Sequence, residues 1–237
     1  MFITEAKMQT LDTTFPGENR TLKAYFASPA GPGPFPGVLV IHEAFGLNNN
    51  IRDITRRFAG QGYAALAADL FSNRNMVLCM FRLFGAMRKD SLDHEGIRDL
   101  RAALTHLAAQ PGVDGARLGA VGYCLGGGLA IALACADNRL KAIAPYYGAN
   151  PRPLDTVARA CPVVGSYPEK DFSTAQGREL EVALTQAGIE HDIKVYPGAR
   201  HSFFNDTSRT AYNPEAAADS WERVLAFFEQ HVKTPPL

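Results

Sequence analysis

The string that most restricts the fold of this chain spans residues 120–127 and reads Ala-Val-Gly-Tyr-Cys-Leu-Gly-Gly. It has the form G-x-C-x-G-G, and it lies between an apolar run typical of a strand, Leu118–Gly122, and one typical of a helix, Leu125–Ala136. This is the spacing of a nucleophile elbow in which cysteine replaces serine. A side chain on so tight a turn needs small residues two positions before and after it, here Gly122 and Gly126. The turn also places the sulfur of Cys124 at the start of a helix, where the helix dipole favours a thiolate.

Three other interpretations of this glycine-rich segment fit less well. A phosphate-binding P-loop requires a lysine after the glycines, and none follows here. A dinucleotide-binding fingerprint is disfavoured because Gly122 lies in the middle of the chain and no acidic residue ends a suitably placed later strand. The uncharged stretch 119–136 is long enough to resemble a membrane span, but its glycines leave an apolar helix too short to cross a bilayer.

The order of patterns along the chain predicts a single α/β domain over residues 1–237. Apolar runs of strand length alternate with amphipathic runs of helix length, which is typical of a mostly parallel sheet with helices on both faces. Two short runs around a turn at 16–19 predict an antiparallel hairpin at the N-terminal edge. The segment 71–89 is the least regular, and it falls where a cap over a pocket would lie.

The individual elements are predicted from apolar spacing and turn residues. The expected strands are Met8–Thr13, Thr21–Ala27, Val38–Ile41, Ala64–Ala68, Leu118–Gly122, Ala142–Tyr146, Val163–Ser166 and Ile193–Tyr196. The expected helices are Asn50–Gln61, His94–Ala109, Leu125–Ala136, Thr174–Ala187 and Pro214–His231.

Charge and cysteine content restrict the partners and the compartment. The 24 basic and 24 acidic residues balance, so the sequence gives no electrostatic reason to expect nucleic acid or a membrane surface as a partner. The first residues lack the pattern of a signal peptide, which predicts a cytoplasmic protein. The four cysteines show no metal-ligand spacing, so we expect free thiols, no bound metal and no cofactor.

A nucleophile elbow requires a histidine that follows it in the chain, together with an acid between the two. His191 begins a predicted strand between two acidic residues and is typical of a surface position. His201 lies in the loop that leaves the last strand, where a catalytic histidine would reach back across the strand ends. We therefore predict His201 as the base.

The acid has several candidates. Asp171 follows the strand Val163–Ser166 and precedes a helix, so it is either the triad carboxylate or a helix N-cap. Glu169 is its nearest rival. The remaining candidates between the elbow and the histidine are Asp137, Asp155 and Asp192. The position of Asp171 at a strand exit favours it for this role.

The loop that leaves the first central strand reads His-Glu-Ala-Phe-Gly-Leu-Asn over residues 42–48. In a fold with a nucleophile elbow this loop supplies one backbone N–H to the oxyanion, and the residue after the nucleophile supplies the other. The predicted pair is Ala44 and Leu125. Glu43 is either a solvated carboxylate or a group beside the cysteine.

Taken together, these motifs resemble the dienelactone hydrolase (carboxymethylenebutenolidase) family of the α/β-hydrolase fold. The resemblance runs in order from about residue 20 to the C-terminus and also includes Gly62–Ala65, Asp69–Leu70, Tyr146–Gly148, Glu169–Asp171 and His201–Phe203. It implies a triad of Cys124, His201 and Asp171. It also implies that Glu43 contacts the thiol and activates it only once substrate has bound, which would protect the cysteine from oxidation.

One position departs from the family pattern. Well-studied members bind the substrate carboxylate with an arginine shortly after the histidine, and this chain has Asn205 there. Arg82 and Arg88 in the predicted cap can supply a cation, or they are surface residues. Tyr123, beside the nucleophile, is a further candidate for substrate contact.

The sequence thus predicts hydrolysis of a small ester or lactone through a cysteine nucleophile and an acyl-thioester, by a monomer or small homo-oligomer. Two alternatives remain. A general carboxylesterase acting on another small ester would use the same residues. A ligand-binding or thiol-redox module on this fold would keep Cys124 reactive without turning over an ester.

Overall fold

A computed structural model describes residues 8–89 and 92–234. Eight strands form one sheet in the order β1-β2-β4-β3-β5-β6-β7-β8. Strands β1 and β2 pair antiparallel, β2 pairs antiparallel with β4, and all other neighbours are parallel. The N-terminal edge hairpin and the mostly parallel sheet are therefore as predicted, and the architecture is the α/β-hydrolase fold.

The strands and helices alternate after the hairpin. The strands are β1 (Gln9–Pro16), β2 (Thr21–Ser28), β3 (Phe35–Ile41), β4 (Ala64–Asp69), β5 (Val113–Tyr123), β6 (Leu140–Tyr146), β7 (Val163–Lys170) and β8 (His191–Arg200). The helices are α1 (Asn49–Gly60), α2 (Met76–Lys89), α3 (Glu95–Ala108), α4 (Leu125–Ala136), α5 (Ser173–Ala187) and α6 (Pro214–Phe228), with a short 3-10 helix at Leu154–Arg159 and a π-helical turn at Glu229–Lys233.

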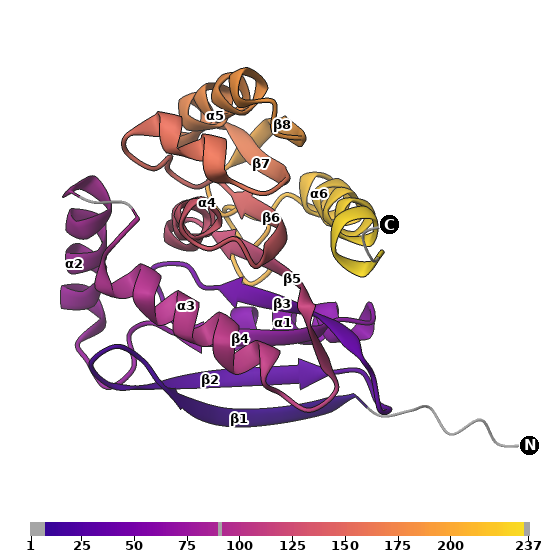
Figure 1. Ribbon diagram of the computed structural model, residues 1–237. Helices are drawn as coiled ribbons and strands as arrows, with labels where there is room; N and C mark the ends of the chain where they lie inside the picture. Colours follow the sequence, from indigo (N-terminus) through magenta and orange to yellow (C-terminus); the bar gives the residue numbers. More distant parts are fainter. Residues whose placement is uncertain (1–7, 90–91, 235–237) are drawn as a thin grey trace, which may run out of the picture.

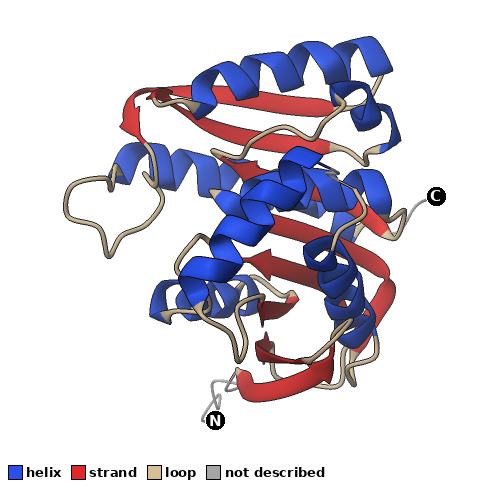
Figure 2. Cartoon of the chain, turned by 90° about the vertical axis from the view of Figure 1, so that its left-hand side faces the viewer, coloured by secondary structure: helices blue, strands red, loops and turns tan. Residues whose placement is uncertain are grey.

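Both faces of the sheet are covered by helices, as the layers in Figure 1 and Figure 2 show. Alternate residues of each strand point to opposite faces, so Leu39 and Ile41 of β3 join the core beneath α3, α4 and α5. Val38 and Val40 join the other core, beneath α1 and α6. The parallel strands consequently read as continuous apolar runs in the sequence.

Helix α4 occupies the centre of the first core. Its residues from Leu125 to Cys135 are buried on every side, which explains why its sequence carries no charge. It is 12 residues long, or about 18 Å. No helix among the described residues is long and apolar enough to cross a membrane.

Helix α2 was not predicted, because we expected residues 71–89 to be irregular. It stands on the side toward which β3 points, at the edge of the sheet where the parallel strands end (Figure 1). The terminal methyl of Met87 lies against Gly128 in the first turn of α4, so the end of α2 is close to the elbow. Several of its apolar side chains are exposed: Met76, Val77, Leu78, Phe81 and Phe84.

Candidate active site

The turn between β5 and α4 has the geometry that the sequence predicts for an elbow. Cys124 has φ 55° and ψ −114°, a conformation that residues with a side chain rarely adopt. A Cβ on Gly122 would overlap the carbonyl of Gly126, and a Cβ on Gly126 would overlap the carbonyl of Ile41. Both glycines are therefore required by the close approach of strand, helix and the neighbouring strand β3.

The sulfur of Cys124 is mostly buried, and this decides its protonation. Burial raises the pKa of the thiol to about 11, although the N–H of Leu125 acts in the opposite direction, and the charges of Glu43 and Asp171 raise it further. The helix start was expected to favour the thiolate, but burial outweighs that effect. With a pKa of about 11, the Cys124 thiol is protonated near neutral pH.

His201 and Asp171 come together at the ends of neighbouring strands. His201 follows β8, Asp171 follows β7, and Nδ1 of the histidine lies 2.6 Å from Oδ2 of the aspartate. Within the described part of the chain, Nε2 of His201 has no hydrogen-bond partner. Asp171 also accepts hydrogen bonds from the N–H of Phe172 at 2.7 Å and from the hydroxyl of Ser173 at 2.5 Å, which hold its carboxylate in place just before α5.

Two of the other carboxylates considered from the sequence, Glu169 and Asp192, are engaged elsewhere. Glu169 accepts a hydrogen bond from the N–H of Gly198 at 2.9 Å. Asp192 lies near the start of β8, at the other end of the strand from His201, and pairs with Arg223 at 2.7 Å. His191 contacts the carbonyl of Ile189 and the hydroxyl of Thr185, away from the elbow.

Glu43 is 3% exposed and lies among polar groups from three strand ends. The hydroxyl of Tyr147 donates to its Oε1 at 3.4 Å, and the amide of Asn205 donates to its Oε2 at 3.5 Å. Burial raises the pKa of Glu43, against hydrogen bonds from Ser202, Tyr147 and Asn205 and the nearby His201. Glu43 is therefore buried rather than a solvated loop carboxylate, and its charge acts on Cys124.

Two aromatic rings hold the imidazole of His201. Tyr147 lies with its ring centroid 4.9 Å away, and Phe172 stacks at 5.0 Å with an interplanar angle of 24°. Tyr147 belongs to the Tyr146–Gly148 motif of the family resemblance, although no role was predicted for it, and Phe172 was not singled out at all. Tyr147 has φ 41° directly after β6, an unusual conformation that directs its side chain between Glu43 and His201.

The chain was compared with known protein families and with proteins of known sequence. Residues 22–232 match the model of the dienelactone hydrolase family. The chain belongs to the dienelactone hydrolase family. It is 36% identical to a protein from Yersinia pestis and 32% identical to one from Saccharolobus solfataricus, both assigned as carboxymethylenebutenolidases. These alignments cover 93% and 91% of this chain and 88% and 96% of the two relatives.

Among solved structures, a protein from Klebsiella pneumoniae assigned as a dienelactone hydrolase has a TM-score of 0.81 and 31% sequence identity. The match covers 95% of this chain and 100% of the other. These comparisons identify a hydrolase of the dienelactone hydrolase family.

The three residues predicted to contact substrate, Tyr123, Arg82 and Arg88, lie in surroundings that differ from one another. Tyr123 is 1% exposed, and its ring packs against Tyr146 at 4.8 Å and Phe204 at 5.3 Å, so it is part of the core. Arg82 lines a small cavity of about 80 Å³ beneath α2, together with Arg20 and Glu95. Arg88 lies in the last turn of α2 and is exposed.

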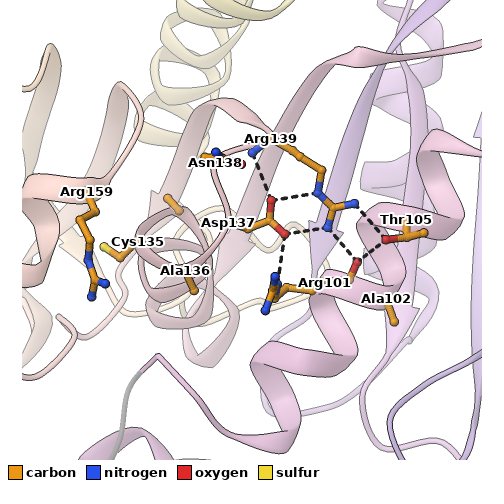
Figure 3. A pocket seen from close by; sticks show the side chains of 10 residues that line it. Arg101, Ala102, Thr105, Cys135, Ala136, Asp137, Asn138, Arg139 and Arg159 are labelled. Atoms are coloured by element: carbon orange, nitrogen blue, oxygen red, sulfur yellow. Dashed lines mark hydrogen bonds and ion pairs between the residues drawn. The ribbon is translucent and has the colours of Figure 1, made fainter.

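A larger hollow of about 710 Å³ lies at the far end of α4 (Figure 3). Figure 3 shows Arg139 and Arg101 converging on Asp137, with nitrogen–oxygen distances of 2.6 Å and 3.4 Å. At 1.5 Å per residue, Asp137 is about 20 Å from Cys124 along the helix. This hollow is built around an ion cluster that ties α4 to α3, and Asp137 is too remote to serve as the acid.

Proposed function

We propose that this chain hydrolyses a small ester or lactone through Cys124 as the nucleophile, with His201 as the base and Asp171 as its partner. The observation that supports this most strongly is the convergence of three strand ends. The strained turn after β5 presents Cys124, and the 2.6 Å His201–Asp171 pair follows β8 and β7 of the same parallel array. Parallel strands end at one edge, so the three groups share that edge.

In the first half of the proposed reaction, Nε2 of His201 takes the proton from the sulfur, directly or after Glu43 has done so. The sulfur attacks the carbonyl carbon, and the electron pair of the C=O bond moves to the oxygen. The N–H groups of Leu125 and Ala44 stabilise this oxyanion. When the C–O bond breaks, the leaving oxygen takes the proton from His201 and an acyl-thioester remains on Cys124.

In the second half, His201 removes a proton from water, and the resulting hydroxide adds to the thioester carbonyl. The tetrahedral intermediate collapses, the carbon–sulfur bond breaks, and the carboxylic acid leaves. The thiolate regains its proton from His201. A thiolate is most effective against substrates with a good leaving group, such as the enolate of an enol lactone, so we expect poor activity on amides.

Glu43 is proposed to act before the attack. Its charge acts on both Cys124 and His201, and burial raises its pKa above that of an exposed carboxylate, which makes it the stronger proton acceptor. The neutral resting thiol means that the nucleophile forms only when a nearby group accepts its proton.

A carboxylesterase acting on uncharged small esters is the second candidate. The observation that favours it is Asn205, whose amide faces Glu43 at the position where the family resemblance implies an arginine for the substrate carboxylate. We further propose a single domain in which α2 caps the site. A panel of p-nitrophenyl esters and a carboxylate-bearing dienelactone would separate the two candidates, through the ratio of their kcat/KM values.

The experiment that tests the nucleophile is Cys124→Ala, with Cys161→Ala as the matched loss of a thiol outside the site. We expect Cys124→Ala to reduce hydrolysis of p-nitrophenyl acetate by at least about a thousandfold and Cys161→Ala to retain it. Rapid quenching of the wild type should reveal an acetyl group on Cys124 by mass spectrometry. Activity of Cys124→Ala within about tenfold of the wild type would refute the proposal.

A further inference from the structure

His42 is a buried polar residue that the proposed mechanism does not use. It follows β3, is 0% exposed, and lies with its ring centroid 4.8 Å from that of Phe71. Its Nδ1 is 2.6 Å from the backbone carbonyl oxygen of Glu43, and the N–H of Leu70 donates to its Nε2 at 3.1 Å. Both nitrogens of the ring are therefore engaged by backbone groups.

These two contacts determine where the ring proton lies. The N–H of Leu70 can only donate, so Nε2 of His42 must present its lone pair. The proton is then on Nδ1, which donates to the carbonyl of Glu43. Burial lowers the pKa of His42, although the Glu43 carbonyl and Asp69, 4.0 Å from Nε2, act in the opposite direction, so the neutral form persists.

The carbonyl that accepts this hydrogen bond belongs to the same peptide unit as the N–H of Ala44. A trans peptide is planar, and its C=O and N–H point in opposite directions, so fixing one fixes the other. The carbonyl also receives the N–H of Gly46, but at 3.4 Å this is a longer contact. The N–H of Ala44 itself has no partner within residues 8–89 and 92–234.

This peptide lies close to the elbow. The carbonyl oxygens of Ile41 and His42 lie directly against the Cα of Gly126, where a Cβ could not be accommodated. The loop of residues 41–44 therefore abuts the first turn of α4, the same turn that presents the N–H of Leu125. The unpaired N–H of Ala44 and the N–H of Leu125 therefore belong to segments that lie against each other.

We propose that His42 is a positioning residue for the oxyanion hole, holding the Glu43–Ala44 peptide so that its N–H points at the substrate oxygen. This inference rests on the proposed function, which assigns that N–H to the oxyanion. The hydrogen bond to the carbonyl also polarises the peptide, which makes its N–H a stronger donor. The contribution is made in the transition state, when charge develops on the oxygen, and so affects kcat more than KM.

Two substitutions separate this role from simple packing, because each preserves one of the two contacts. In His42→Asn, the side-chain NH2 takes the place of Nδ1 and can donate to Glu43, but the acceptor for Leu70 is lost. In His42→Gln, the longer side chain can accept from Leu70, but the donor to Glu43 is lost. Both are expected to lower the melting temperature, since each leaves a contact of the buried ring unmade.

We expect His42→Gln to lower kcat about ten- to a hundredfold with KM nearly unchanged, and His42→Asn to restore most of that loss. Removing an oxyanion donor altogether costs about 10²–10³ in kcat, so a misaligned donor should cost less. Equal loss of kcat in both variants, tracking their loss of stability, would overturn the inference while leaving the proposed function intact. Cys124→Ala, measured in the same experiment, tests the proposed function separately. If Cys124→Ala retains its activity, the proposed function itself is refuted.

A measurement on the unaltered protein covers the case in which either variant fails to fold. The ¹⁵N chemical shifts of the histidine rings distinguish a protonated Nδ1 from a protonated Nε2. We expect the ring of His42 to show the Nδ1–H tautomer without change from about pH 6 to 9. The Nε2–H tautomer, or a ring that becomes charged in this range, would overturn the inference.

Discussion

His201 and Asp171 lie at the ends of the neighbouring strands β8 and β7, with Nδ1 of the histidine 2.6 Å from Oδ2 of the aspartate. This contact fixes the proton of the neutral imidazole on Nδ1 and leaves the lone pair on Nε2. The geometry thus prepares Nε2 to accept a proton, which is the property that a catalytic base needs.

We therefore predict that Asp171→Asn lowers kcat by about 10³–10⁴, because the amide NH2 of asparagine would favour the wrong imidazole tautomer. The oxygen that accepts from Phe172 is retained in asparagine, so the free energy of unfolding should change by only about 1 kcal/mol. Steady-state kinetics and urea unfolding measure the two quantities.

Glu169→Gln is the matched control, since Glu169 lies two residues from Asp171 and binds the N–H of Gly198 instead of His201. It should leave kcat within about threefold of the wild type. A large loss of kcat in Glu169→Gln with little loss in Asp171→Asn would assign the acid to Glu169.

The protonation of Cys124 gives a prediction for pH dependence. Burial raises the pKa of its thiol to about 11, so the thiol form predominates at all pH values below that, and the thiolate fraction rises about tenfold per pH unit toward it. Alkylation of Cys124 by iodoacetamide, which requires the thiolate, should accordingly be slow near neutral pH and accelerate up to about pH 11. A plateau at or below about pH 8 would show that the resting cysteine is already ionised.

Glu43→Gln should have opposite effects on alkylation and on turnover. The charge of Glu43 raises the pKa of Cys124, so its removal should lower that pKa and speed alkylation at a given pH. Ester turnover should fall, because the substrate-dependent proton acceptor is lost. Glu181→Gln, on the exposed face of α5, is the control that should change neither rate. Parallel loss of both rates in Glu43→Gln would contradict this assignment.

The sequence predicted the elbow well because its determinants are local. Gly122, Gly126 and the uncharged run after them reflect a turn and a buried helix, and α4 has the same bounds in the structure as in the prediction. The lengths of β7 and β8 were underestimated. Pairing with each other carries both strands through Pro168 and Pro197, residues that the sequence marks as breaks.

The features that could not be predicted depend on contacts between distant segments. Tyr147 and Phe172 meet His201 only because three strand ends lie together, and no spacing within the chain indicates this. Helix α2 was missed because Leu78, Phe81 and Phe84 are exposed, which blurs the apolar face that identifies a helix in a sequence. The neutral state of the Cys124 thiol depends on burial, which only the packed structure reveals.

The close packing of the elbow gives a prediction for stability. Gly126→Ala should destabilise the fold by about 1–3 kcal/mol, because the added Cβ would overlap the carbonyls of Ile41 and His42. Gly85→Ala is the control, since nothing lies within 4 Å of the position of its Cβ in the interior of α2. That substitution should stabilise the protein by about 0.5–1 kcal/mol. A melting temperature of Gly126→Ala above that of Gly85→Ala would refute the close packing of the turn.

Phe172 gives a prediction that separates positioning from packing. Its side chain is 72% exposed, so Phe172→Ala should change the free energy of unfolding by no more than about 0.5 kcal/mol. The same ring stacks on His201, and its loss should let the imidazole move and lower kcat about tenfold. Phe172→Tyr retains the stacked face and should keep most of the activity, while Val182→Ala removes an exposed apolar side chain of α5 away from the histidine and should have no effect on kcat. If kcat of Phe172→Ala equals that of the wild type, the stacked ring has no part in holding His201.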